Sequence, residues 1–457
     1  MISLQRLLDK GQVEALIQGC GLRPTAASAK AALFVQAAHR LKTSGTATQS
    51  QVRAFFVPGR IEVLGKHTDY AGGRSLVAAL EQGFCMVAVP RADAQVVVWA
   101  DQGQPVSFAL DPELVAKHGH WSNYPMTVAR RLARNFPACR QGMELAFCSD
   151  LPPASGMSSS SALMVGTYLA LAAFNQLEAD PRYQRQVHNQ LELAAYLGTV
   201  ENGQNFGELA GDQGVGTFGG SEDHTAILCS RAGHIGQFAY CPARFERYIS
   251  LPAGHLFAIG CSGVVAEKTG AAQALYNRAS ARVRAMVEAW QRGTGGTEQH
   301  LYPILHSGPG AAAHLRQLLA VQQQGPFSPA ELSDRLEHFI AENEEIALPA
   351  GEALAQGDLE HFGQLVDRSQ ALTETLLGNQ VPQTVALARL AREGGAAAAS
   401  AFGAGFGGSV WALVSEERAD VFLDRWARGY ARAFPGLPGG FFLSQAGPAT
   451  FTLAGLG

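Results

Sequence analysis

The spacing of apolar residues in the first half of the chain predicts strands with a few helices between them. Residues 52–65 hold apolar runs on either side of Pro58 and Gly59, which predicts a strand, a tight turn and a second strand. Similar runs predict strands at residues 84–100, 106–110 and 143–148. Longer stretches with helical spacing predict helices at residues 123–138, at 182–200 and directly after the serines at 158–161.

The second half of the chain is mostly helical by the same criterion. A strand at residues 255–262 opens it, helices continue to about Glu393, and one more strand is predicted at 409–415. The Gly-rich segment 206–218 predicts an extended loop before this half begins. Because strands and helices do not alternate regularly, we expect an α+β fold and not a doubly wound parallel sheet.

The length and punctuation of the chain predict two domains and a short extension. A chain of 457 residues is long enough for two packed domains. Leu/Ala-rich patches alternate with Ser, Thr and Gly over residues 1–50, which predicts an N-terminal helical extension. Pro242 and Pro252 mark a boundary near 242–254, which divides a first domain, 51–245, from a second, 246–457.

Composition narrows the class of protein and its partners. Hydrophobic residues make up 47% of the chain and charged residues 16%, as in ordinary globular proteins. A formal net charge of −4 and the lack of Lys/Arg runs give no reason to expect nucleic acid or an anionic membrane as a partner. Seven scattered cysteines without a Cys-x-x-Cys pair indicate reduced thiols. The N-terminus lacks the features of a signal peptide, so we expect a cytoplasmic location.

The strongest chemical motif is Ser-Gly-Met-Ser-Ser-Ser-Ser at residues 155–161, between a predicted strand and a predicted apolar helix. Closely approaching backbone amides, small side chains and a helix N-terminus suit a polyphosphate. Ser160 is the natural Mg²⁺ ligand, because a hydroxyl at a helix start can face both phosphate and metal. A serine N-cap on a buried helix is the alternative, but four consecutive serines exceed what capping requires.

Two further motifs concentrate glycine or polar residues. Residues 402–409, Phe-Gly-Ala-Gly-Phe-Gly-Gly-Ser, precede an apolar strand and on their own fit either a ligand loop or a plain turn. Residues 58–73 bring a cation, a carboxylate, an imidazole and hydroxyls into one short turn region. Such a set is costly to bury unless its members pair in a structural cluster or bind a polar ligand.

Together these motifs closely resemble the galactokinase branch of the GHMP kinases. Residues 59–73 resemble its signature Gly-Arg-x-Asn-x-Ile-Gly-Glu-His-Thr-Asp-Tyr-x-x-Gly, the serine loop resembles the superfamily's phosphate loop, and residues 403–408 resemble its glycine-rich third motif. Further similarities lie at 121–124, 201–202, 276–277, 341–344 and 357–365, and residues 220–224 fall where the family has Gly-Ile-Met-Asp-Gln. The matches follow the family's order from about residue 53 to 415.

This resemblance implies a two-domain GHMP kinase fold, in which an N-terminal mixed-sheet ATP-binding domain packs on a C-terminal ferredoxin-like α+β domain. It implies an Mg-ATP-dependent kinase that phosphorylates the anomeric hydroxyl of galactose or a close relative. The implied ATP-binding residues are Trp121, Asn123, Gly156, Ser158, Ser159, Ser160, Ser161 and Gly405. Mg²⁺ would be held by Ser160 and Glu201.

The resemblance also implies roles at the sugar. Asp223 maps to the family's catalytic aspartate, which would orient the sugar hydroxyl and accept its proton. Arg60 would neutralise charge on the γ-phosphoryl group and keep Asp223 ionised. The implied sugar-binding residues are Lys66, His67, Asp69, Gly220 and Tyr276. With this small-molecule substrate we expect no nucleic acid or membrane partner, and a monomer or weak homo-oligomer.

Two departures from the signature leave alternatives open. Lys66 stands where galactokinases carry a Glu that receives a sugar hydroxyl, and Glu62 replaces the signature's Asn. A Lys near the sugar's C6 end would favour a uronic acid such as galacturonate, unless Lys66 points outward or pairs with Glu62 or Glu222. A non-catalytic sensor that binds ATP and sugar is a second alternative, and a kinase of a non-sugar alcohol is a third. The intact serine run, Arg60 and Asp223 favour catalysis.

Overall fold

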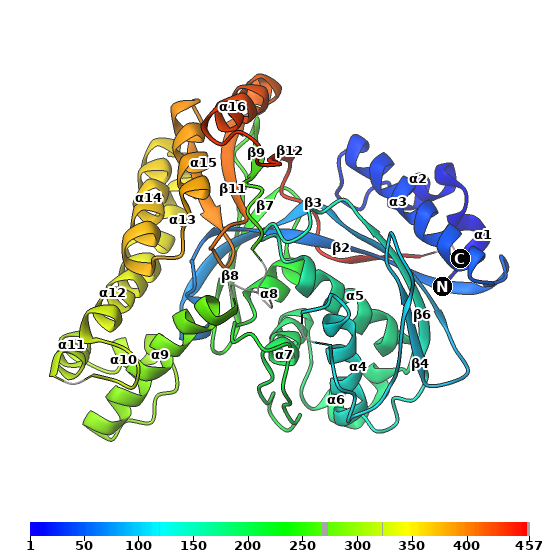
Figure 1. Ribbon diagram of the computed structural model, residues 1–457, viewed down its shortest axis with the longest axis horizontal. Coiled ribbons are helices and arrows are strands. Elements are labelled where there is room, and N and C mark those ends of the chain that lie inside the picture. Colours follow the sequence, from blue (N-terminus) through cyan, green and yellow to red (C-terminus); the bar gives the residue numbers. More distant parts are fainter. Residues whose placement is uncertain (118, 267–272, 322, 455–457) are drawn as a thin grey trace.

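Two β-sheets organise the computed structural model, which describes residues 1–117, 119–266, 273–321 and 323–454. Figure 1 shows the large sheet with helices on both of its faces and a smaller lobe of sheet and helices beside it. This arrangement confirms the expected α+β class. No helix among these residues is long and apolar enough to cross a bilayer.

The large sheet is mixed. Its strands are β1 (Ile2–Ser3), β2 (Gln51–Leu64), β3 (Arg74–Pro90), β4 (Gln95–Trp99), β5 (Val106–Ala109), β6 (Met143–Ser149), β7 (His234–Ala239), β8 (Arg244–Ser250) and β13 (Phe451–Leu453). The main path runs β1-β2-β3-β6-β4-β5, with β7, β8 and β13 attached beside it. β4 pairs with β6 in parallel, whereas the β2–β3 and β3–β6 pairs are antiparallel.

Alternation along β3 gives the sheet a separate core on each face. Cys85 and Val87 pack on one side with Phe34 of α3, whereas Met86 faces the opposite core. Helices α1 (Leu4–Leu7), α2 (Lys10–Ile17) and α3 (Pro24–Thr43) build the first side. Residues 1–50, expected as an extension, are therefore a layer of the large-sheet lobe, because α3 buries an apolar face on β3 and β6.

The second face of the large sheet carries the helices that position the candidate motifs. They are α4 (Asn123–Asn135), α5 (Ser159–Phe174), α6 (Pro181–Gln184), α7 (Gln190–Asn202) and α8 (Glu222–Cys229). α5 is apolar on all sides because it lies between the sheet and the other helices, and it packs on β2, β3 and β6. The serine motif therefore sits at the start of a largely buried helix of this lobe.

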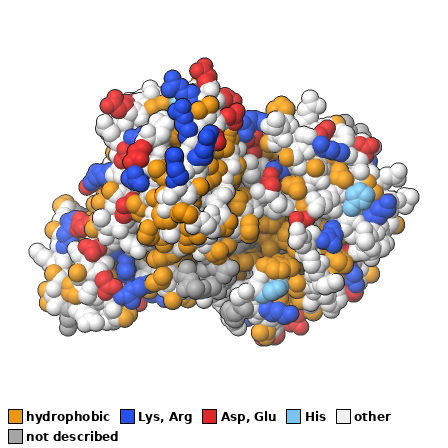
Figure 2. Space-filling view, turned by 45° about the horizontal axis from the view of Figure 1, so that its top comes forward, with side chains coloured by type: hydrophobic (Ala, Val, Ile, Leu, Met, Phe, Trp, Pro, Cys, Tyr) orange, Lys and Arg blue, Asp and Glu red, His pale blue; other side chains and the backbone are white. Residues whose placement is uncertain are grey.

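The small lobe has a ferredoxin-like sheet, as expected. Its strands β9 (His255–Cys261), β10 (Ala398–Phe402), β11 (Ser409–Ser415) and β12 (Gly440–Ser444) pair antiparallel in the order β10-β11-β9-β12. Helices α15 (Pro382–Glu393) and α16 (Ala419–Ala433) cover one face and complete the β-α-β-β-α-β arrangement. Figure 2 shows hydrophobic side chains gathered in the hollow between the two lobes.

A helical arm is inserted between β9 and α15. It comprises α9 (Gln273–Thr294), α10 (Leu301–Leu305), α11 (Ala311–Val321), α12 (Pro329–Ile340), α13 (Leu348–Gln356) and α14 (Leu359–Leu372). One π-helical segment, Ala341–Ala347, joins α12 to α13, and a second, Thr373–Leu377, follows α14 at the end of the arm. The far end of the arm has a core of its own, built from α9 to α12 and joined by Ala71 of the signature turn. This contact ties the arm to the end of β2.

Three local expectations differ from the structure. Residues 52–65 do not turn at Pro58 and Gly59, because β2 continues to Leu64 with only a register shift there. The helix expected at 182–200 is broken into α6 and α7, because the Asn189 side chain caps a new helix start. The tail does not stay in the small lobe, because β13 pairs with β2, as β1 does.

Candidate active site

The signature turn, residues 65–73, connects β2 to β3 and is held by a carboxylate from the helical arm. Glu342 Oε1 accepts hydrogen bonds from the backbone N–H of Gly65 at 2.8 Å and of Lys66 at 3.2 Å. Thr68 Oγ1 donates to the carbonyl oxygen of Arg74 at 2.6 Å and closes the turn. His67 has a positive φ of 56°, and its ring nitrogens lie 3.0 Å from Tyr70 Oη and 3.2 Å from the carbonyl oxygen of Ala404.

Several of the predicted site residues line one polar cavity between the two lobes. Its lining includes Arg60, Glu62, His67, Asp69, Tyr70, Glu201, Asn202, Gly219, Gly220, Glu222, Asp223, Tyr276, Gly403 and Ala404. Five of these residues carry carboxyl groups and one carries a guanidinium. Such a lining can accept several hydroxyl hydrogens from a polar ligand.

Arg60 and Asp223 form a close ion pair in this cavity, although 163 positions separate them in the chain. Arg60 Nε donates to Asp223 Oδ1 at 2.8 Å, and Nη2 lies 2.7 Å from the same oxygen. Arg60 is only 2% exposed, and its Nη1 also donates to the carbonyl oxygen of Gly156 at 2.5 Å. The guanidinium thus joins the carboxylate of Asp223 to the serine loop.

The other predicted sugar-side residues surround this pair. Asp69 Oδ2 accepts a hydrogen bond from the backbone N–H of Glu222 at 3.2 Å, which fixes the turn against the start of α8. The His67 ring lies 5.6 Å from the Tyr276 ring. A Cβ at Gly220 would lie 2.4 Å from Asp69 Oδ2, so this position requires glycine.

The serine loop lines a second cleft of about 400 Å³ with an aromatic end and a polar end. Aromatic walls come from Phe84, Trp121, Tyr124 and Phe147, and the polar end from Gly156, Ser158, Ser159 and Ser160. Ser158 has a positive φ of 57° and directly precedes α5. Its Oγ is buried and has no hydrogen-bond partner among the described residues. A flat base could stack on the aromatic end of this cleft, and a phosphate chain could accept hydrogen bonds from the polar end.

The glycine motif forms the turn between β10 and β11 and packs against the serine loop. A Cβ at Gly403 would lie 2.7 Å from the carbonyl oxygen of Gly156, so the two backbones approach as only glycine allows. Ser409 Oγ donates to the carbonyl oxygen of Ser155 at 2.8 Å. The two motifs, one from each lobe, therefore form a single structural unit.

Three predicted nucleotide residues are not among the described residues that line the second cleft. Asn123 is buried and donates its side-chain amide to the carbonyl oxygen of Val215 at 3.3 Å. Gly405 packs against Asn379. Ser161 Oγ donates to Glu201 Oε2 at 2.8 Å and lies 3.4 Å from Asp223 Oδ2, so it faces the polar cavity.

Lys66 is absent from the described residues that line the polar cavity. It is 1% exposed, and its Nζ donates to Ser400 Oγ at 2.7 Å and to Ser369 Oγ at 3.2 Å. These serines belong to β10 and α14, so the ammonium joins the signature turn to the small lobe. The expected grip of Lys66 on the sugar therefore has no support in this geometry, and a uronate carboxylate would find no ammonium in the lining.

The predicted metal residues lie on the two sides of the serine loop. Ser160 lines the aromatic cleft and Glu201 lines the polar cavity. Within the described ranges no group of three or more His, Cys, Asp or Glu side chains could hold a metal ion by itself. A hydroxyl and one carboxylate fit a Mg²⁺ that is held mainly by the phosphates of a substrate.

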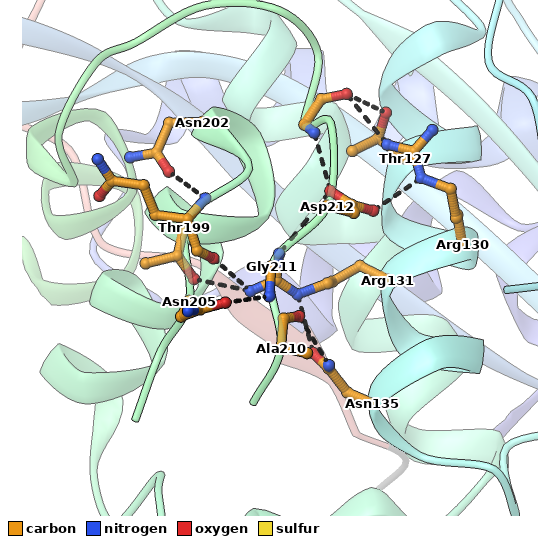
Figure 3. Close-up of polar contacts among 12 residues, drawn as sticks. Thr127, Arg130, Arg131, Asn135, Thr199, Asn202, Asn205, Ala210, Gly211 and Asp212 are labelled. Atoms are coloured by element: carbon orange, nitrogen blue, oxygen red, sulfur yellow. Dashed lines mark hydrogen bonds and ion pairs between the residues drawn. The ribbon is translucent and has the colours of Figure 1, made fainter. Parts of the chain in front are cut away.

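A buried charge network anchors the loop that leads to Asp223 (Figure 3). Arg130 Nε donates to Asp212 Oδ2 at 2.7 Å, and Arg131 Nη2 donates to the carbonyl oxygen of Gln204 at 2.6 Å. Both arginines project from α4 toward the loop, as Figure 3 shows. Burial lowers the pKa of Arg131, a cost that the nearby charge of Asp212 partly offsets. This Gly-rich loop is thus fixed at its middle.

Sequence reasoning missed two features of the site. Glu222 was considered only as a partner for Lys66, yet it lines the polar cavity beside Asp223. Phe84 and Phe147 complete the aromatic cleft from adjacent strands, with their rings 5.3 Å apart. Nothing in the local sequence marks these two phenylalanines, because strands of any buried sheet contain such residues.

Comparison with known proteins agrees with this geometry. Family models match at residues 43–90 (galactokinase galactose-binding signature), 123–220 (GHMP kinases N terminal domain) and 351–432 (GHMP kinases C terminal). A galactokinase from Chloroflexus aggregans is 30% identical over 82% of this chain and 87% of its own length. One from Enterococcus faecalis is 29% identical over 82% and 89%, respectively.

Solved structures share the fold. The crystal structure of Lactococcus lactis galactokinase complexed with galactose superposes with a TM-score of 0.73 at 24% identity, covering 90% of this chain and 98% of that one. A mevalonate kinase superposes with a TM-score of 0.52 at 15% identity, covering 87% and 99%. The chain is therefore a member of the galactokinase family of GHMP kinases, which are ATP-dependent phosphotransferases.

Proposed function

We propose that this protein transfers the γ-phosphoryl group of ATP to the anomeric hydroxyl of galactose. The observation that carries the proposal is the position of Arg60, which pairs with Asp223 in the polar cavity and bonds to Gly156 in the serine loop. A sugar in the cavity and a phosphate on the loop would meet at this guanidinium. The galactose-binding signature at residues 43–90 and the galactokinase relatives support galactose as the sugar.

In this proposal ATP occupies the aromatic cleft. Trp121 stacks on the adenine, as aromatic side chains do on bases, and the serine loop binds the phosphates. The free backbone N–H groups at the start of α5 and the unpaired Ser158 hydroxyl donate to phosphate oxygens. Ser160 and Glu201, which line the two neighbouring cavities, would hold a Mg²⁺ that neutralises phosphate charge when bound.

The transfer itself depends on the ion pair. The Asp223 carboxylate accepts the proton of the anomeric hydroxyl as the oxygen attacks the γ-phosphorus. Arg60 faces the charge that develops on the transferring group and keeps the carboxylate in position. His67, Asp69 and Tyr276 orient the sugar, so that the attacking oxygen lies in line with the phosphoryl group.

The test is ADP release by purified protein with Mg-ATP and a panel of galactose, talose, galacturonate, glucuronate and mevalonate. We expect release with galactose and none above background with the uronic acids, because Lys66 does not line the cavity. The Asp223→Asn variant supplies the blank. Release with mevalonate or a uronic acid in place of galactose would contradict the proposal, as would ATP binding without turnover on any sugar.

A further inference from the structure

Two glutamates line the polar cavity at positions where the galactokinase signatures carry uncharged residues. Glu62, near the end of β2, replaces the Asn of the signature. Glu222, the first residue of α8, falls at the Met of Gly-Ile-Met-Asp-Gln. Both belong to the cavity lining and both are nearly buried, at 4% and 5% exposure. Neither has a role in the transfer described above.

An unsatisfied oxygen points to a missing partner. Glu62 Oε1 is buried and has no hydrogen-bond partner among the described residues. A buried carboxylate oxygen without a hydrogen-bond donor is costly. A ligand hydroxyl in the cavity is the kind of group that would satisfy it, because hydroxyls donate one hydrogen and accept others.

The two carboxyls influence each other. Burial raises the pKa of Glu62, and the positive charges of Arg60 and Lys66 offset this only in part. Burial raises the pKa of Glu222 well above its usual value, and the negative charge of Glu62 adds to this effect. The charged and titratable groups around the pair are Arg60, Lys66, Asp69, Asp223 and Tyr240. A carboxyl that keeps its proton can donate a hydrogen bond, and a carboxylate beside it can accept one.

The position of Lys66 explains why the cavity needs another hydroxyl-binding group. The signature glutamate that receives a sugar hydroxyl is replaced here by a lysine whose ammonium is turned toward Ser369 and Ser400. The cavity thereby loses one carboxylate at that point and gains two others at Glu62 and Glu222. The formal charge of the three positions is the same, because Glu62, Lys66 and Glu222 stand where the signatures have Asn, Glu and Met.

We propose that Glu62 and Glu222 form a hydroxyl-binding subsite that determines which sugar this enzyme accepts. The pair binds one sugar hydroxyl other than the anomeric one, with Glu62 Oε1 as its acceptor. This inference rests on the proposed function, since it names a contact of the same sugar in the same cavity. It assigns to Glu62, within the signature, and to Glu222, outside it, the contact with a sugar hydroxyl that the signature glutamate makes in galactokinases.

The experiment measures sugar binding directly, by calorimetry, for galactose and its 2-, 3-, 4- and 6-deoxy derivatives. Wild-type protein is compared with Glu62→Gln, Glu222→Gln and the double variant. We expect the Kd for galactose to rise by about tenfold or more in the variants, because each weakens a hydrogen bond between a sugar hydroxyl and a charged group. For the one deoxy sugar that lacks the bound hydroxyl, the variants and wild type should bind alike. The double variant should lose no more than the stronger single variant, because the pair acts as a unit.

Two controls separate this from a loss of folding. The Kd for Mg-ADP reports the aromatic cleft and should not change in the variants. Glu81→Gln removes a buried carboxylate that pairs with Arg23 at 2.6 Å and lies outside both cavity linings, so it should leave sugar affinity unchanged. Unaltered galactose affinity in Glu62→Gln would overturn the proposal, and so would equal weakening for all four deoxy sugars. Wild-type protein that binds no galactose would refute the proposed function instead.

Discussion

Replacing Asp223 by asparagine should abolish most turnover while the protein stays folded. The amide is the same size as the carboxylate and keeps an acceptor oxygen for Arg60 Nε, now 2.8 Å away. It cannot accept the proton of the sugar hydroxyl. General-base catalysis typically contributes about 10²–10⁴-fold, so we expect kcat to fall by a factor in that range.

The stability cost follows from the charges that remain. Breaking a buried ion pair by removing one partner commonly costs about 3–5 kcal/mol. Arg60 would retain the nearby carboxyls of Glu62 and Glu222, both of which raise its pKa, so we expect a loss below about 3 kcal/mol. The Asp223→Asn variant should therefore stay folded at room temperature.

The assay combines three measurements on Asp223→Asn: kcat from ADP release with saturating galactose and Mg-ATP, the Kd for Mg-ADP, and the thermal midpoint. Glu81→Gln is the matched control, because it removes a buried carboxylate paired with an arginine at 2.6 Å outside both cavities. The control should lose stability but keep its kcat. An Asp223→Asn enzyme with normal nucleotide affinity and turnover within about tenfold of wild type would refute the role of the carboxylate as base.

Four other substitutions test separate parts of the structure. Lys66→Met removes one of the polar contacts between the lobes, so the thermal midpoint should fall, in line with a loss of about 1–3 kcal/mol for polar groups that lose a partner, while the KM for galactose stays near wild type. Trp121→Ala removes an aromatic wall worth about 1–3 kcal/mol to a stacked base, so the KM for ATP should rise about tenfold in steady-state kinetics. Asp212→Asn should speed limited proteolysis within residues 203–220 and lower kcat, because the loop before the catalytic carboxylate loses its anchor. Burial raises the pKa of Glu222 in the folded protein, so the folded state binds this proton more tightly than the unfolded state does. The free energy of unfolding should therefore fall as the pH rises above about 4.5, the ordinary pKa of a glutamate. Thermal midpoints measured between pH 5 and pH 8 should decline more for wild type than for Glu222→Gln.

The sequence predicted the framework because its signals are local. Apolar spacing located the strands of both lobes, and the helix after the serines is apolar on every side, as its burial in the structure requires. The turn predicted at Pro58 and Gly59 was wrong, although these residue types normally mark turns. Here they produce only a register shift, since Gly59 must fit against Leu151 and the backbone of Met157.

The site was predictable where a motif defines it and unpredictable where distant segments meet. Arg60 and Asp223 could be paired because each lies in a motif of known order. The destination of Lys66 could not be foreseen, since it depends on Ser369 and Ser400, more than 300 positions away. Tertiary packing determines such contacts, and the residues near Lys66 in the sequence do not indicate which distant side chains it will meet.

The most direct measurement is ADP release by the wild-type enzyme with galactose and Mg-ATP, with Asp223→Asn as the blank. If Arg60 joins a sugar cavity to a phosphate loop, as its bonds to Asp223 and Gly156 indicate, galactose should stimulate release well above the blank and yield a sugar phosphorylated at the anomeric oxygen. Release that galactose does not stimulate, or a product phosphorylated at another hydroxyl, would contradict the placement of the sugar at Asp223.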